Sequence, residues 1–206
     1  PGISFGNKED KMGIRASETR AVFFDNVRVP AENIIGELGK GFKIAMNVLN
    51  TGRLSLGSGS VGGMKVALAL ATNHAKNRKQ FGQAISNYGM IQEKIATMAA
   101  NTYASESLVY FTTGRMNQGQ QEFSLESAIC KVYCSEKLWE TVDKALQIAA
   151  GNGYMREYPY ERMMRDARIN LIFEGTNEIL RVYIALTGMK EPSDKLVELG
   201  KVADVS

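Results

Sequence analysis

The spacing of apolar residues over two long stretches constrains the fold of this chain more than any other feature. Apolar and small residues recur every three or four positions within 86–118, and the same spacing returns within 122–150. Such a period places these residues on one face of a helix. The two helices are joined by a short turn around Gly119. The two series are Ile91, Ile95, Met98, Thr102, Ser105, Val109, Thr112 and Met116, and then Leu125, Ile129, Val132, Trp139, Val142, Leu146 and Ala149.

Three further helices are predicted, at 41–77, 159–167 and 176–188. Pro159 stands in the first turn of the helix predicted at 159–167, where the N–H that proline lacks would have no partner anyway. A weaker helical pattern around Leu196 and Leu199 follows in the tail. Because long helices joined by short loops pack against their neighbours, we predict an all-α fold, an up-and-down four-helix bundle.

Residues 1–36 have a different pattern, in which apolar and polar residues alternate around Val22, Phe24, Val27 and Val29. A period of two is typical of β-strands, and the proline and glycine residues that follow are typical of turns. We therefore expect a short segment of strands and turns before the helical bundle.

The composition is that of an ordinary globular chain, with 44% hydrophobic and 23% charged residues. A formal net charge of +3 is too small to indicate nucleic-acid binding. We find no continuous apolar stretch with the length of a membrane span, and no signal peptide. Since the first residue is Pro1 rather than methionine, we expect a fragment or a processed product.

The two cysteines, Cys130 and Cys134, lie four residues apart on a predicted helix, and the only histidine, His74, is distant in sequence. A metal site needs more ligands than these, and helical neighbours at this spacing form a disulfide only with difficulty. We therefore predict two packed free thiols and no metal site.

The string GSGSVG at 57–62 matches the G-x-G-x-x-G fingerprint of dinucleotide-binding folds. That fingerprint functions in the turn between a strand and a helix, whereas the residues before this string have a helical period. We interpret the glycines as a thin part of a helix that another backbone or a ligand approaches closely. The phosphate loop is the less favoured alternative. Each glycine costs roughly 1 kcal/mol of helix propensity, so the cluster needs such a reason.

Glu174 interrupts the otherwise apolar run in NLIFEGTNEILR, at 170–181, and lies on a turn before a helix. A charge there is costly to desolvate unless it is paired or used. Desolvation favours the neutral acid and the helix N-terminus favours the anion, so the residues alone leave the role open. Glu174 could be a general base, a salt-bridge partner of Arg168 or Arg181, or a helix cap. The same helix start could also bind an anion.

IFEGTNEILR resembles the C-terminal signature of the acyl-CoA dehydrogenases, flavoproteins that oxidise the α,β-bond of fatty acyl thioesters. Four more stretches resemble motifs of that family in the same order: GFKIAMNVLNTGR, NRKQFG, ALQIAAGNGY and YPYERMMRDARI. The resemblance covers roughly residues 1–190 and is greatest to the branch that acts on long and very long acyl chains. It implies that 1–37 ends a middle β domain, that 38–189 is the C-terminal helical bundle with the site, and that 190–206 begins a C-terminal extension.

The resemblance also implies roles for single residues. Glu174 would be the base that removes an α-proton while a hydride passes from the β-carbon to FAD. Some relatives carry the base on the first long helix, where this chain has Gly52; with Gly57 and Gly59, Gly52 would widen an acyl channel. The implied cofactor contacts are Arg78, Gln80, Phe81, Gln147, Ile148, Ala149, Ala150, Gly151, Thr176, Asn177 and Glu178. The implied substrate contacts are Asn50, Arg53, Phe173 and Gly175.

Two of these positions depart from the family pattern. Asn50 replaces the usual acidic residue, and Ala150 stands where many members have a second glycine. The contacts from 78–81 and 147–151 would reach FAD bound mainly by a neighbouring subunit.

For the whole protein, the resemblance implies a mitochondrial enzyme of fatty acid β-oxidation that passes electrons to electron-transfer flavoprotein. It implies a homodimer or homotetramer, with peripheral membrane association through the rest of the C-terminal extension. Because most of the β domain is absent, the isolated segment should bind FAD poorly and be inactive. The alternative is an interaction role such as respiratory complex I assembly, in which a relative of this branch takes part.

Overall fold

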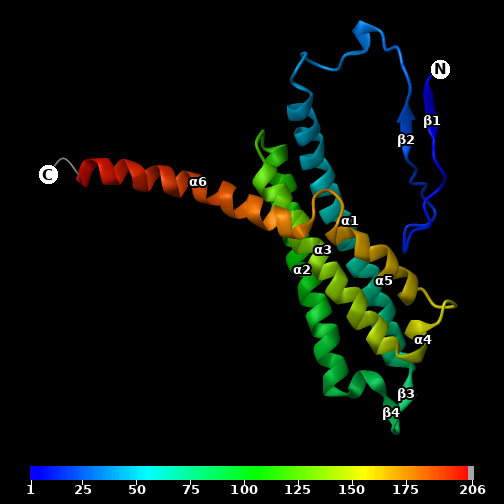
Figure 1. Ribbon diagram of the computed structural model, residues 1–206. Helices are drawn as coiled ribbons and strands as arrows, with labels where there is room; N and C mark the ends of the chain where they lie inside the picture. The colour runs from blue at the N-terminus through cyan, green and yellow to red at the C-terminus, as the bar shows by residue number, and fades with distance from the viewer. Residues whose placement is uncertain (204–206) are drawn as a thin grey trace.

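Three long helices lie side by side in the computed structural model, which describes residues 1–203 (Figure 1). They are α1 (Gly41–Asn77), α2 (Gly89–Asn117) and α3 (Ser124–Ala149). α1 packs along the length of α3, and α2 lies against both. The fourth member is short: α5 (Tyr160–Arg168) packs on α3 after a single turn, α4 (Gly151–Tyr154). The all-α prediction is therefore confirmed.

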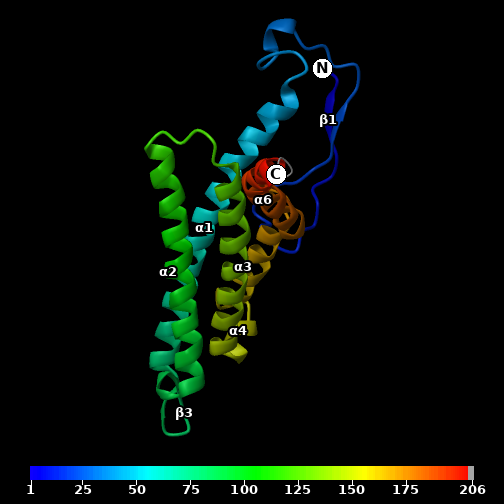
Figure 2. The same cartoon turned by 90° about the vertical axis from the view of Figure 1, so that its left-hand side faces the viewer.

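The last helix, α6 (Asn177–Ala203), is longer than predicted. It packs on α3 only near its start and then projects away from the bundle, as Figure 2 shows nearly end-on. The predicted end at residue 188 is wrong, because α6 continues through Pro192. The weaker helical pattern around Leu196 and Leu199 lies inside this continuation, so a helix there is confirmed. Residues 192–198 are exposed all round, so no buried face links this pattern to the start of α6.

The N-terminal segment forms a two-stranded antiparallel sheet, β1 (Ile3–Phe5) with β2 (Val22–Phe24), in which Ile3 lies opposite Phe24. The predicted strand around Val22 and Phe24 is confirmed, but no strand forms at 27–29. A short 3₁₀ helix, η1 (Ala31–Asn33), precedes α1.

The loop between β1 and β2 is fastened to α5. The N–H of Ile14 donates to the Asp166 carboxylate at 2.6 Å, and Arg165 donates to the Met12 carbonyl at 2.9 Å. Gly13 permits this approach, since a Cβ there would lie 2.4 Å from the Arg165 carbonyl oxygen. The strands are therefore joined to the helix that leads to Glu174.

Small residues bring α1 close to α3. A Cβ at Gly57 would lie 3.4 Å from the Cβ of Cys130, whereas Gly59 and Gly62 have open space around them. The string at 57–62 lies inside α1, so the phosphate-loop alternative is wrong and the helical interpretation is confirmed, with close approach at Gly57. Cys130 and Cys134 are buried free thiols, as predicted.

By length and composition alone α1 could cross a membrane, contrary to the expectation from the sequence. Its buried face packs against α3 and α2, however, as the core helix of a bundle does. The sequence analysis looked for a continuous apolar stretch. Glycines and single polar residues interrupt the apolar residues of α1 without lowering its mean hydropathy much.

Candidate functional site

The chain reverses direction between α5 and α6 through a 3₁₀ helix, η3 (Ile169–Leu171), and residues 172–176, which we call the Glu174 turn. Glu174 and Gly175 both have left-handed backbone angles, with φ of 59° and 93°. This conformation suits glycine but is unfavourable for glutamate, so contacts from outside the turn must hold it.

The Glu174 carboxylate lies directly against the backbone of α1. A Cβ built on Gly52 would lie 2.8 Å from Oε2 and 3.1 Å from Cδ of Glu174. Gly52 therefore provides the space that the carboxylate occupies. Any side chain at position 52 would displace it.

Beside this carboxylate is a cavity of about 460 Å³, the Glu174 cavity. Gly52 and Gly59 line it, but Gly57 faces α3 instead, so Gly57 cannot widen a channel here. Its lining is Gly52, Ser55, Leu56, Gly59, Ser60, Leu138, Asn170, Phe173 and Glu174.

The structural alternatives for Glu174 are not realised within the described residues. Arg181 pairs with Glu136 at 2.6 Å, and the Arg168 guanidinium lies 5.8 Å from the centre of the Trp139 ring. The cap of α6 is Thr176, whose hydroxyl accepts from the N–H of Ile179. Glu174 Oε2 is buried and has no hydrogen-bond partner in residues 1–203. The carboxylate is thus left with an unused acceptor beside a cavity.

Two buried cations hold the Glu174 turn. Arg53, 5% exposed, donates from Nε to the Glu174 carbonyl at 3.1 Å. Lys131 on α3 is completely buried and donates from Nζ to the Gly175 carbonyl at 2.8 Å and to Oδ1 of Asn177 at 2.6 Å. Two successive carbonyls therefore each accept a charged hydrogen bond, the stronger kind.

The sequence analysis missed Lys131. The signal that could have found it is its place in a series with steps of three and four residues on α3, between positions that are buried. That series is Ala128, Lys131, Ser135, Leu138, Val142 and Ala145.

Burial lowers the pKa of Lys131 to about 8, and the nearby positive charge of Arg53 acts in the same direction. Glu178, Glu174 and Glu136 oppose this shift by favouring the ammonium ion. Desolvation thus outweighs the surrounding carboxylates.

The free energy of unfolding should therefore rise with pH between about 8 and 10.5, the folded and ordinary pKa values of Lys131. In this range the unfolded chain binds a proton that the folded chain does not, so raising the pH favours the folded state, by up to roughly 3 kcal/mol. Urea unfolding of the 206-residue chain at successive pH values, compared with Lys131→Met, isolates this contribution. Parallel curves for the two proteins over this range would contradict the prediction.

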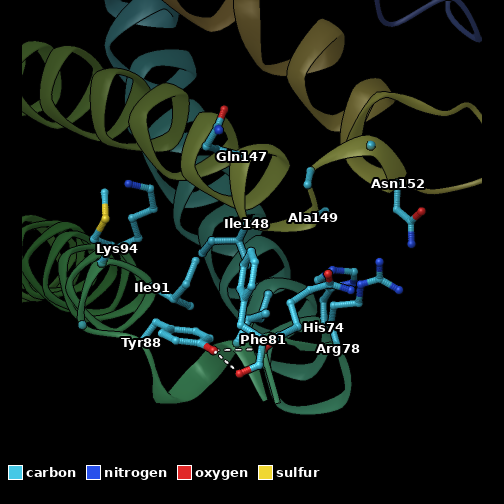
Figure 3. Close-up of a pocket in the computed structure, with 16 residues that line it drawn as sticks. His74, Arg78, Phe81, Tyr88, Ile91, Lys94, Gln147, Ile148, Ala149 and Asn152 are labelled. Atoms are coloured by element: carbon cyan, nitrogen blue, oxygen red, sulfur yellow. Dashed lines mark hydrogen bonds between the residues drawn. The ribbon is translucent and has the colours of Figure 1, made fainter. Parts of the chain in front are cut away.

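A second and larger cavity, of about 1020 Å³, lies at the other end of α1 (Figure 3). It brings together two stretches that the sequence analysis singled out separately, around Arg78 and at 147–151. Figure 3 shows Phe81, Ile91 and Ile148 gathered in its middle, with Arg78 at one side. The lining is His74, Arg78, Gln80, Phe81, Ile85, Tyr88, Gly89, Met90, Ile91, Lys94, Gln147, Ile148, Ala149, Ala150, Gly151 and Asn152.

A hairpin that was not predicted presents Phe81 to this cavity. β3 (Lys79–Gln80) pairs with β4 (Gln83–Ala84), and a 3₁₀ helix, η2 (Ile85–Asn87), follows. The two turn residues, Phe81 and Gly82, have φ of 50° and 85°, the left-handed pair of a tight hairpin turn. The Tyr88 hydroxyl donates to the carbonyls of Gln80 and Phe81.

On the opposite wall, Ala150 also has a left-handed φ, of 52°. Glycine adopts this conformation without strain, whereas a side chain such as that of alanine makes it unfavourable.

The remaining sequence-predicted residues lie with Glu174, not in the larger cavity. Gly52 and Arg78 are 26 residues apart along α1 and its C-terminal end, so these two residues are separated by roughly 39 Å along the helix axis. Phe173 lines the Glu174 cavity. Asn177 is 3% exposed, and its amide nitrogen donates to Ser135 and Glu136.

Arg53 and Asn50 form a pair near the turn, with Nη1 of the arginine donating to Oδ1 of Asn50 at 3.2 Å. The structure thus gives Arg53 a contact to the turn that the sequence analysis did not foresee. Binding of coenzyme A by these two residues stays a prediction.

A family model described as the C-terminal domain of acyl-CoA dehydrogenase matches residues 39–188. The chain belongs to the acyl-CoA dehydrogenase family. The very long-chain specific acyl-CoA dehydrogenase of Bos taurus mitochondria is 49% identical over 199 residues, which are 97% of this chain and 30% of the relative. The chain therefore spans about 30% of the length of this relative and of its Homo sapiens counterpart.

Solved structures of the family share the fold. The butyryl-CoA dehydrogenase of Megasphaera elsdenii is 40% identical, with a TM-score of 0.89 over 92% of this chain and 49% of that one. An acyl-CoA dehydrogenase of Bacillus anthracis, solved with FAD, is 44% identical, with a TM-score of 0.88 over 94% of this chain and 36% of that one. FAD is the cofactor of this family.

Proposed function

We propose that this chain is the catalytic C-terminal part of an enzyme that dehydrogenates long- and very-long-chain fatty acyl-CoA in β-oxidation, with Glu174 as the base. The observation that carries the proposal is the buried Oε2 of Glu174, which has no partner in the described residues and borders a cavity. Such an oxygen can accept a proton from a bound molecule. The identity with very-long-chain enzymes supports the choice of acyl chain.

In the proposed reaction, the Glu174 carboxylate takes the α-proton of the thioester. The backbone N–H of Glu174 donates to the thioester oxygen and stabilises the charge that develops there. Arg53 donates to the carbonyl of the same residue and so fixes the peptide plane between Glu174 and Gly175. Gly175 leaves room for the thioester end of coenzyme A, and Phe173 covers the acyl chain. Bound FAD would supply the acceptor for the hydride that leaves the β-carbon.

The side chains present fit parts of FAD. The larger cavity combines the Arg78 cation, suited to phosphate oxygens, with the apolar surfaces of Phe81 and Ile148. The start of α6, with Thr176 and Glu178, offers helix N–H groups for a pyrophosphate. Because these regions are far apart along α1, we propose that the larger cavity receives FAD held mainly by a neighbouring subunit of a homodimer or homotetramer.

Other parts of the proposal concern the whole protein. Residues 1–37 would end a β domain, 38–189 would hold the site, and 190–206, of which 204–206 lie outside the described residues, would begin an extension that associates with a membrane. We propose a mitochondrial location and electron-transfer flavoprotein as the electron acceptor. The segment alone would be inactive, since the rest of the flavin site would come from elsewhere.

An interaction role is the second candidate, and one observation favours it. Val182, Leu186 and Met189 form an exposed apolar stripe along α6. A stripe of this kind suits docking on another protein, such as a factor in respiratory complex I assembly.

Anaerobic addition of palmitoyl-CoA to the FAD-loaded full-length protein tests the first proposal. We expect the flavin absorbance to bleach, and to bleach faster with palmitoyl-CoA than with butyryl-CoA. Faster bleaching with butyryl-CoA would contradict the long-chain assignment but not the dehydrogenase activity. No bleaching with either thioester would reject the dehydrogenase and favour the interaction role.

A further inference from the structure

Lys131 is a buried charge to which the proposed reaction assigns no part. It lies on α3, completely buried, and both of its hydrogen bonds go to the chain around Glu174. A charged side chain at full burial is costly to desolvate unless its hydrogen bonds are satisfied. The presence of the ammonium therefore calls for a reason other than packing.

The geometry of the Glu174 turn supplies that reason. Glu174 has an unfavourable left-handed φ of 59°, and the next residue is the most flexible amino acid, glycine. Arg53 fixes the carbonyl of Glu174 itself, and Lys131 fixes the carbonyl of Gly175. Without the second contact, rotation about Gly175 could relax the turn and swing the carboxylate away from Gly52.

Lys131 also joins the turn to the start of α6. Its second acceptor is Oδ1 of Asn177, whose amide nitrogen is held by Ser135 and Glu136 of α3. One ammonium group thus links the backbone just after Glu174 to the first residue of α6 and to α3. Glu178 is the remaining charged neighbour, on the first turn of α6.

We propose that Lys131 is a positioning residue, which holds the Glu174 turn in the conformation that presents the Glu174 carboxylate to its cavity. This inference rests on the proposed role of Glu174 as the base. Lys131 itself does not touch the thioester; it acts through the Gly175 carbonyl.

The test is Lys131→Met in the FAD-loaded full-length protein, with Lys144→Met as the matched control. Lys144 lies on the same helix, but it pairs with Glu140, away from the turn. At saturating palmitoyl-CoA, we expect flavin reduction by Lys131→Met to slow by about 10- to 100-fold, as for a misplaced catalytic group. In Lys131→Met the FAD content should be unchanged, and the affinity for palmitoyl-CoA should stay within about threefold of the native value. The rate of flavin reduction by Lys144→Met should stay within about twofold of the native rate.

Amide hydrogen exchange gives a second readout that does not depend on activity. Exchange at residues 174–177 should be at least about fivefold faster in Lys131→Met than in the native protein, and unchanged in Lys144→Met. Native rates and native exchange in Lys131→Met would overturn the inference. A loss confined to substrate affinity would overturn it as well.

Two further variants separate the possible failures. If Lys131→Met does not fold, Lys131→Gln is tested in its place, because glutamine keeps a donor for one of the two acceptors. If both variants lose FAD or fail to fold, the role of Lys131 is purely structural and the inference is overturned. Glu174→Gln tests the base by itself. If that variant stays active while Lys131→Met exchanges faster at the turn, the proposed function has failed and the positioning of the turn by Lys131 stands.

Discussion

Replacing Glu174 with glutamine should slow flavin reduction by palmitoyl-CoA about 10³-fold in the full-length protein, because the amide cannot accept the α-proton. The side chains have nearly the same shape, and Oε2 makes no hydrogen bond that the fold would lose within residues 1–203. FAD content and the unfolding temperature should therefore stay as in the native protein. Stopped-flow absorbance of the flavin under anaerobic conditions measures the rate.

The matched control for this variant is Glu140→Gln. Glu140 lies on α3, pairs with Lys137 and Lys144, and does not line the Glu174 cavity. Glu140→Gln should reduce flavin within about twofold of the native rate, since a surface ion pair contributes little beyond its own contacts. If Glu174→Gln kept a tenth or more of the native rate, the base would have to be another residue.

The helical part of the fold could be predicted from the sequence because each long helix has a buried face. α1 has the predicted bounds, and α2 and α3 begin and end within three residues of the predicted ones. The continuity of α6 past residue 188 could not be predicted, since Pro192 lies within it and residues 192–198 have no buried face. The hairpin at 79–84 was missed for a related reason: its strands have two residues each, too few to show a period.

The candidate base could be predicted because a carboxylate in an apolar run is conspicuous, whereas its supports could not. Lys131 looks like an ordinary polar residue of an amphipathic helix until Gly175 and Asn177, more than 40 positions later, are placed beside it. The close approach of Gly52 to Glu174 is likewise a contact between distant parts of the chain. Periodicity reports the face on which a residue lies but not the partner that it meets there.

Moving the carboxylate from position 174 to position 52 should restore activity that Glu174→Gly loses. A Cβ at position 52 would lie within 3.2 Å of all three carboxylate atoms of the native Glu174, so a side chain from α1 can enter the same space once that glutamate is removed. Glycine also adopts the left-handed φ of position 174 without strain. We expect Glu174→Gly to be inactive and the double variant Gly52→Glu/Glu174→Gly to reduce flavin at least about 10-fold faster than it, by regained general base catalysis.

Gly52→Glu alone should be nearly inactive, because two carboxylates would then compete for one site and repel each other. The double variant Gly62→Glu/Glu174→Gly is the matched control, since Gly62 lies on the same helix, faces open space and does not line the Glu174 cavity. That control should remain as inactive as Glu174→Gly. Recovery in both double variants would mean that an added negative charge on α1 is sufficient, and recovery in neither would mean that the base acts only from the Glu174 turn. Rescue by position 52 alone would establish that the reaction depends on where the carboxylate lies rather than on which helix or turn carries it.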